Sequence, residues 1–132
     1  MTGTIQAAPD VTAVLTRLYD LEVTRQLEPW LELWDDDFEI VFPFATDPAR
    51  LPVRGKDRLR SDQVAKFDER ARIELRVEVL PLADPLRAVV KLDVRHVLSA
   101  GGERKLPVLC IFTLTPEGRI LRLEEYFNEV AL

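Results

Sequence analysis

Cysteine and histidine are almost absent from this sequence. Cys110 is the only cysteine and His96 the only histidine among 132 residues. One cysteine cannot form an internal disulfide, and neither residue type is numerous enough for a cysteine-based or histidine-rich zinc site. A glycine-rich phosphate loop, a dinucleotide-binding fingerprint and a Ser-His-Asp order are also missing. We therefore expect no metal and no cofactor.

Long apolar runs and basic clusters are lacking as well. No run approaches the roughly 18 apolar residues of a membrane-spanning helix. The 18 lysine and arginine residues are outnumbered by 23 aspartate and glutamate residues, giving a net charge of −5. Such a surface does not attract a phosphate backbone, so we expect neither nucleic acid nor membrane as a partner. Residues 1–8 lack the features of a signal peptide, so we expect a cytoplasmic location.

The first half of the chain has the spacing of helices. Its length and its 47% hydrophobic content suit one globular domain, which we place at 9–132 after a flexible tail of residues 1–8. Apolar residues at three- and four-residue intervals predict a helix over 10–24. A short second helix carries Trp30 and Trp34 and ends at the acidic run 35–37, which we interpret as a solvated turn.

The remaining elements follow a short early strand at 38–42 and a proline-rich loop. Gly55 opens a third helix that extends to about Ala71. Strict alternation then predicts a strand with one apolar face, followed by three more strands separated by turns. These four strands span residues 73–80, 87–98, 105–113 and 119–128. Helices first and antiparallel strands afterwards indicate an α+β domain.

Three segments resemble a known family. Residues 12–43 are similar to its two opening helices and acidic stop, residues 53–57 to the start of its third helix, and residues 117–128 to its closing strand. The family is the SnoaL-like and ketosteroid isomerase-like branch of the nuclear transport factor 2-like superfamily, which includes polyketide cyclases. The resemblance implies a cone-shaped, curved, mainly antiparallel sheet with three N-terminal helices that enclose a hydrophobic pocket.

The steroid isomerase chemistry is not carried over to this chain. That family uses a tyrosine on the first helix, an aspartate base after the first strand and a protonated aspartate on a late strand. The matching positions hold Leu18, Phe42 and Cys110. Tyr19 is one residue away and would point about 100° from the required direction on a helix, so we do not count it as a substitute.

His96 and Glu125 are the candidate catalytic residues. His96 shares strand parity with Leu92, Val94 and Leu98, and Glu125 with Leu121, Leu123 and Phe127. If these faces point inward, an imidazole able to act as a base and a costly carboxylate share one apolar cavity. The alternatives are a core histidine bonded to a neighbour and a glutamate at the mouth of the cavity.

The same parity arguments and the resemblance select the residues expected to line the pocket. Most are aromatic or aliphatic, although aromatic residues at such spacing are more often simple core residues. Cys110 is interpreted as a small apolar filler rather than a nucleophile. The expected lining is Leu18, Trp34, Phe42, Phe44, Phe67, Val94, Cys110, Phe112, Leu123 and Phe127.

Two functions remain open at this stage. One is a cofactor-free isomerase, cyclase or dehydratase acting by acid–base chemistry on an apolar carbonyl compound. The other is a non-catalytic module that binds an apolar ligand or serves dimerisation. We also expect a homodimer, because Val89–Val90 and the run 108–112 present apolar side chains on both faces of the sheet.

Overall fold

The computed structural model describes residues 8–45, 47 and 52–127 of the chain. The predicted tail, apart from Ala8, and Asn128 lie outside these residues. Three helices and six strands occur within the described part. In chain order they are α1 (Val11–Val23), α2 (Leu27–Glu32), β1 (Trp34–Val41), β2 (Val53–Arg54), α3 (Lys56–Glu69), β3 (Arg70–Pro81), β4 (Arg87–Leu98), β5 (Glu103–Leu114) and β6 (Ile120–Tyr126).

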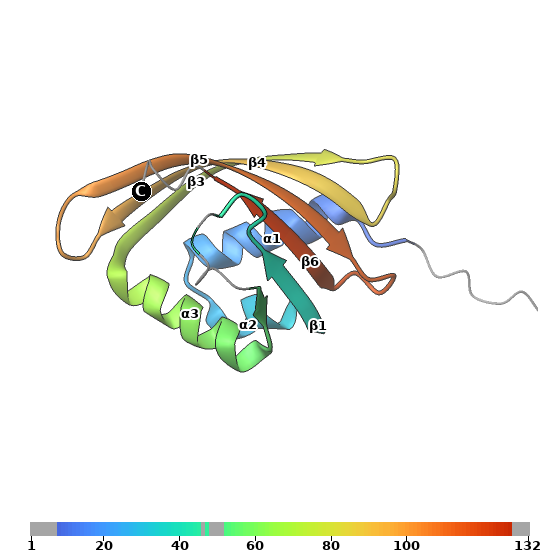
Figure 1. Cartoon of the computed structure of the whole chain (residues 1–132), viewed down its shortest axis with the longest axis horizontal. Coiled ribbons are helices and arrows are strands. Elements are labelled where there is room, and N and C mark those ends of the chain that lie inside the picture. The colour runs from blue at the N-terminus through green and yellow to red at the C-terminus, as the bar shows by residue number, and fades with distance from the viewer. Residues whose placement is uncertain (1–7, 46, 48–51, 128–132) are drawn as a thin grey trace, which may run out of the picture.

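The strands form a single curved sheet in the order β2-β1-β6-β5-β4-β3. Every neighbouring pair is antiparallel except β1 and β6, which run parallel. The sheet arches over the three helices, all of which lie on its concave side (Figure 1). The predicted α+β class and the curved, mainly antiparallel sheet are therefore confirmed. The short strand β2 has no counterpart in the sequence prediction.

Helix α1 is held in place by its cap and by its apolar face. The side chain of Asp10 accepts a hydrogen bond from the backbone of Ala13 at 3.1 Å, which satisfies one of the free N–H groups of the first turn. Leu15, Leu18 and Leu21 are buried at three-residue spacing, and this face packs on β3. Burial of this stripe, more than intrinsic helix propensity, stabilises the helix against the sheet.

Strands β4 and β5 show why the sheet has one buried face. Alternate residues of β4 from Ala88 to His96 are buried, as are alternate residues of β5 from Leu106 to Leu114. Successive side chains of a strand point to opposite faces, so each strand contributes one row to the concave side. His96 belongs to the buried row, as its parity predicted.

The acidic run 35–37 is not the turn that the sequence suggested. Helix α2 ends at Glu32, and the run lies inside β1. Trp34 pairs with Ile120 and Glu39 with Arg122, so the register shifts between them. The Asp35 carboxylate accepts a hydrogen bond from the Asp37 backbone at 3.0 Å within this irregular stretch. The residues on either side of the run pair with β6, so the run forms an irregular, bulged part of β1 that keeps a local side-chain hydrogen bond.

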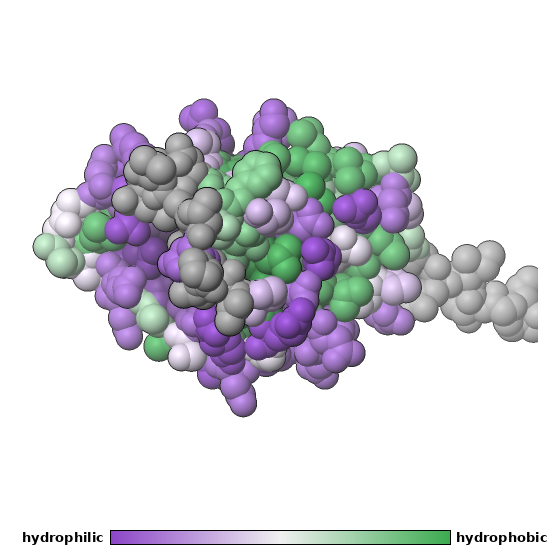
Figure 2. Space-filling model, viewed as in Figure 1, coloured by the Kyte–Doolittle hydropathy of each residue, from purple (hydrophilic) through white to green (hydrophobic). Residues whose placement is uncertain are grey.

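The visible surface is divided between polar and apolar regions. On the face in Figure 2, hydrophilic side chains cover α2 and α3, whereas hydrophobic side chains gather over the sheet near the turn between β3 and β4. Leu80 and Leu82, at that turn, are 38% and 39% exposed. No helix among the described residues is long and apolar enough to cross a membrane.

Candidate functional site

A cavity of about 350 Å³ lies between the concave face of the sheet and the helices. Both candidate catalytic residues line it, His96 from β4 and Glu125 from β6. Most of its surface is apolar, and seven of the residues expected at the pocket contribute to it. These are Leu18, Trp34, Phe42, Val94, Phe112, Leu123 and Phe127.

Three residues expected at the pocket do not line this cavity. Phe44 follows Pro43 in the turn after β1, where it is 71% exposed and its ring contacts Tyr126 with centroids 4.8 Å apart. The ring of Phe67 on α3 instead lies under the guanidinium of Arg25, 5.5 Å from the ring centroid. Cys110 is 1% exposed and packs behind the lining residues. Parity along a strand cannot foresee the first two, because neither residue lies in a strand.

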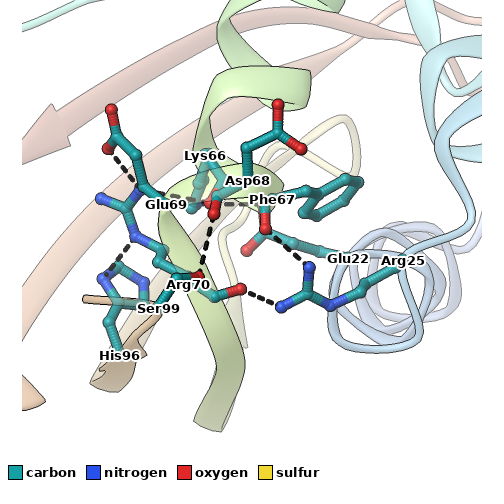
Figure 3. A network of polar contacts seen from close by, with 9 residues as sticks. All are labelled: Glu22, Arg25, Lys66, Phe67, Asp68, Glu69, Arg70, His96 and Ser99. Atoms are coloured by element: carbon teal, nitrogen blue, oxygen red, sulfur yellow. Dashed lines mark hydrogen bonds and ion pairs between the residues drawn. The ribbon is translucent and has the colours of Figure 1, made fainter. Parts of the chain in front are cut away.

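The imidazole of His96 is held by one specific hydrogen bond. Nε of Arg70 donates to Nδ1 of His96 at 3.0 Å, so the neutral ring carries its proton on Nε2 (Figure 3). Nε2 is buried and has no hydrogen-bond partner within the described part of the chain. The ring is therefore oriented as a donor through Nε2.

The protonation of His96 is set by its surroundings. Burial lowers the pKa of His96 to about 3, and three neighbouring cations add to the effect. These cations are Lys66, Arg70 and Arg104. The imidazole is consequently neutral at physiological pH, with its acceptor nitrogen already occupied by Arg70. This state differs from the general base that the sequence suggested.

Arg70 is positioned by contacts at the junction between α3 and β3. The guanidinium of Arg25 donates to the backbone carbonyls of Phe67, at 2.7 Å, and of Arg70. Ser99 in the β4–β5 turn also bonds to the end of α3, through the carbonyl of Asp68 at 2.9 Å (Figure 3). Arg25 has a left-handed backbone with φ of 60°, an unusual conformation for a non-glycine residue. The Ser99 bond joins the end of α3 to the end of the strand that carries His96, and the Arg25 bonds join it to the segment between α1 and α2.

A second group of polar side chains lies beside His96 and Arg70. The carboxylate of Glu22 on α1 is buried and accepts hydrogen bonds from Gln63 at 3.1 Å and Lys66 at 3.3 Å, both on α3. None of these three residues was predicted from the sequence to be part of the site. Glu22 follows Leu15 and Leu18 at seven- and four-residue intervals, so a carboxylate within the apolar stripe was a visible signal. The partners on α3 carried no such signal.

Tyr19 lies at the cavity, contrary to the sequence analysis. It is 7% exposed, and its hydroxyl donates to Sγ of Cys110 at 3.8 Å. The face of α1 turned toward the sheet is wide enough to include both Leu18 and Tyr19, and both line the cavity. Burial raises the pKa of Tyr19 well above its ordinary value, with further contributions from Cys110, Glu22 and Glu125. The hydroxyl is therefore a neutral donor.

Glu125 lies close enough to this hydroxyl to raise its pKa, but far from His96 along the sheet. It pairs with Cys110 on β5, whereas His96 pairs with Arg104 on the same strand. Six residues separate these two positions, or about 20 Å along an extended strand. His96 and Glu125 share one cavity, but His96 is bonded to Arg70 rather than to Glu125. The expected polar pair is thus replaced by two separate polar ends.

The thiol of Cys110 is not activated. Burial raises the pKa of Cys110 well above its ordinary value, and Glu125 adds to this rise. A neutral buried thiol behaves as a small apolar group, as the sequence analysis expected. The described residues contain no group of three or more His, Cys, Asp or Glu side chains that could hold a metal ion.

Solved structures of other proteins share this fold. A Mycobacterium tuberculosis protein in complex with estradiol-17beta-hemisuccinate aligns with a TM-score of 0.81 and 17% identity, over 95% of this chain and 98% of that chain. A phenazine biosynthesis-related protein from Pseudomonas aeruginosa aligns with a TM-score of 0.74 and 18% identity, over 99% of this chain and 85% of that chain. At these identities the likeness establishes the fold.

One further structure is an epoxide hydrolase/cyclase-like enzyme with a role in pyran ring formation in the polyether salinomycin. It aligns with a TM-score of 0.78 and 14% identity, over 92% of each chain. None of the curated proteins matches this sequence. The SnoaL-like domain matches residues 15–123, which is most of the chain. Together with the curved sheet and its three helices, this match shows that the chain belongs to the SnoaL-like domain family.

Proposed function

We propose that this protein is a small enzyme that binds an apolar carbonyl compound and transforms it by acid–base chemistry without a cofactor. Isomerisation, cyclisation and dehydration all belong to this class. One observation carries the proposal. A carboxylate, Glu125, and a neutral hydroxyl donor, Tyr19, are close enough to interact electrostatically within a mainly apolar cavity. The cavity of about 350 Å³ is also of the size that small-molecule sites have.

The two groups have complementary roles in proton transfer. Glu125 accepts a proton from a carbon next to the substrate carbonyl, and the electron pair of that C–H bond moves toward the carbonyl oxygen. The hydroxyl of Tyr19 donates a hydrogen bond to this oxygen as negative charge develops on it. Glu125 then returns the proton to another carbon in an isomerisation. A positioned acid or base of this kind accelerates a reaction by roughly 10²–10⁴-fold.

His96 has a different role in this proposal. A neutral imidazole that already accepts from Arg70 donates a hydrogen bond through Nε2. A buried donor without a partner costs roughly 1–3 kcal/mol, so a ligand oxygen at this point would be stabilised. We assign to His96 the binding and polarisation of a substrate oxygen, at the end of the cavity remote from Glu125.

Two of the similar structures support an apolar, ring-containing substrate. The Mycobacterium tuberculosis protein holds a steroid ester, and the salinomycin enzyme has a role in pyran ring formation. The aromatic and aliphatic lining of the cavity is suited to the same kind of molecule. Trp30 and Trp34 line it and contact each other, with ring centroids 5.5 Å apart.

The test is hydrogen exchange at carbon. Apolar ketones and esters that raise the melting temperature are incubated with the protein in D₂O and followed by proton NMR. The proposal predicts exchange of protons next to the carbonyl at a rate well above that of the buffer. Tight binding of several such compounds without any exchange would contradict the catalytic assignment and favour the non-catalytic binding module.

We also propose a homodimer formed through the outer face of the sheet. Leu80, Val89 and Ile111 are directly opposite one another on β3, β4 and β5; Leu80 is exposed, and the other two are only partly buried. Leu109 on the same face is 39% exposed. A second copy of this face would cover these side chains. Light scattering should give twice the 15.1 kDa chain mass at micromolar concentration. The variant Leu109→Glu should have the mass of a single chain. A monomeric wild type would contradict the dimer.

A further inference from the structure

The His96 end of the cavity carries three cationic side chains. Lys66, Arg70 and Arg104 all line the cavity. Each of them lies close enough to His96 to lower its pKa, and Arg104 acts on Arg70 in the same way. Cations that repel one another at a partly buried site are unfavourable unless an anion joins them. A cation at this end without an anionic partner is therefore a candidate for binding an anionic ligand.

One of these three cations has no carboxylate partner among the described residues. Lys66 is paired with Glu22 at 3.3 Å. Arg70 has an ion pair with Glu69 at 3.3 Å, but that carboxylate is 71% exposed and therefore a weak partner. The Asp62 carboxylate, also at the cavity, is bonded to Arg58 at 3.0 Å. Arg104 is half-buried and forms no hydrogen bond or ion pair with any residue that the structure describes.

Arg104 and His96 can reach the same bound group. They are directly opposite each other on β5 and β4, so their side chains lie on the same face of the sheet, about 5 Å apart at Cβ. The guanidinium of Arg104 offers parallel N–H donors, and Nε2 of His96 offers one more without a partner in the described part of the protein. Arg70 holds the imidazole in this orientation.

We propose that Arg104, His96 and Arg70 form a carboxylate-binding subsite, and that the ligand is an apolar carboxylic acid bound with its carboxylate at this end. The inference rests on the proposed function only in requiring that the cavity holds a small molecule. A guanidinium pairs with both oxygens of a planar carboxylate, which favours this group as the anion. The carboxylate of Glu125 repels an anion at the other end, so the ligand binds in one direction.

This orientation selects the reacting part of the molecule. With the carboxylate at Arg104, the apolar body extends along β5 toward Cys110 and Glu125. The carbon that reacts at Glu125 is then remote from the carboxylate. The substrate class becomes an apolar acid with a second carbonyl group at its far end.

The experiment compares carboxylic acids with their primary amides. Octanoic acid, decanoic acid and 2-naphthoic acid are each paired with the amide of the same skeleton, and binding to the full chain is measured by calorimetry at pH 7. The acid should bind at least tenfold more tightly than its amide, because a hydrogen bond to a charged group contributes more than a neutral one. Added salt should weaken binding of the acid and leave binding of the amide unchanged.

The matched variants are Arg104→Met and Lys105→Met. Lys105 is the next residue on the same strand, carries the same charge and points to the opposite, outer face, where it is 67% exposed. Arg104→Met should remove most of the preference for the acid and leave amide affinity within about twofold. Lys105→Met should preserve the preference. Should Arg104→Met fail to fold, Arg104→Lys, which keeps the charge, replaces it and should retain only part of the preference.

Each outcome decides the question. Equal affinity for acid and amide in the wild type overturns the carboxylate subsite while leaving the proposed ligand pocket intact. A preference that survives unchanged in both Arg104 variants overturns the assignment of Arg104. If no member of either series binds at millimolar concentration, the subsite and the proposed function both fail.

Discussion

The two ends of the cavity are built in different ways. At the His96 end, polar side chains hold one another: Arg70 bonds to His96, and Glu22 bonds to Gln63 and Lys66. At the Glu125 end, the Tyr19 hydroxyl donates to the weak acceptor Sγ of Cys110 and is packed among apolar side chains. A mutually bonded group suits binding and orientation, because its geometry is set before a ligand arrives. A polar group in an apolar setting suits proton transfer.

Substitution of Glu125 should have the largest effect. Glu125→Gln keeps the shape but removes the proton acceptor, so turnover should fall by about 10²–10⁴-fold while ligand affinity changes little. Steady-state kinetics on a substrate identified by exchange measures this. The control is Glu124→Gln, because Glu124 is the adjacent residue on the outer face, where it bonds to Arg122 and Tyr126. Full activity of Glu125→Gln would show that another residue accepts the proton.

The apolar packing at the Glu125 end should dominate stability. Phe112 is completely buried on β5 and its ring meets Tyr19 edge-on with centroids 6.2 Å apart. Phe112→Ala should reduce the free energy of unfolding by about 3–5 kcal/mol, as measured by denaturant titration. Phe44→Ala removes the same side chain from a position that is 71% exposed and should cost less than about 1 kcal/mol. Similar losses in both variants would contradict this picture.

Acid should act mainly through the His96 end. The pKa of His96 is about 3 in the folded protein and near 6.5 when unfolded, so between these values only the unfolded chain binds the proton. The stability that depends on neutral His96 is therefore present above pH 6.5 and is lost as the pH falls toward 3. Between pH 7 and pH 4 the loss from this group is about 3 kcal/mol.

The variant His96→Gln isolates this contribution. Its amide oxygen can accept from Arg70 but does not titrate, so the carboxylates that also respond to acid are common to both chains. Urea unfolding at several pH values should show the wild type losing stability relative to His96→Gln as the pH falls. If the free energy of unfolding depended on pH in the same way for both proteins, His96 would have an ordinary pKa in the folded chain.

Removal of the Tyr19 hydroxyl should have the smallest effect. Tyr19→Phe keeps the buried ring, and the lost bond to Sγ of Cys110 at 3.8 Å is weak, so stability should change by less than about 1 kcal/mol. Turnover should fall by about fivefold, since one neutral hydrogen bond to the substrate oxygen contributes roughly 1 kcal/mol. Unchanged turnover would remove Tyr19 from the proposed mechanism and leave Glu125 to act with another donor.

Much of the fold was predictable because its signals are local. Alternation of apolar residues identified the long strands, and the spacing from Val11 to Leu21 identified the first helix. The strand β1 was harder, since the run 35–37 favours a turn locally and lies within a strand only because the residues that flank it pair with β6. Pairing of this kind joins residues about 85 positions apart and leaves no pattern within either segment.

The site also combines features that local sequence signals predict with features that depend on contacts between distant segments. Parity along the strands was enough to place His96 and Glu125 on apolar strand faces, because successive side chains of a strand point to opposite faces. The bond from Arg70, at the end of α3, to His96 and the bond from Lys66 to Glu22 on α1 depend on how the elements pack and could not be read from parity. Only the register of β4, β5 and β6 decided that the two candidates lie at separate ends of one cavity. Contacts between elements depend on how helices and strands pack against each other, and that information is spread over the whole chain.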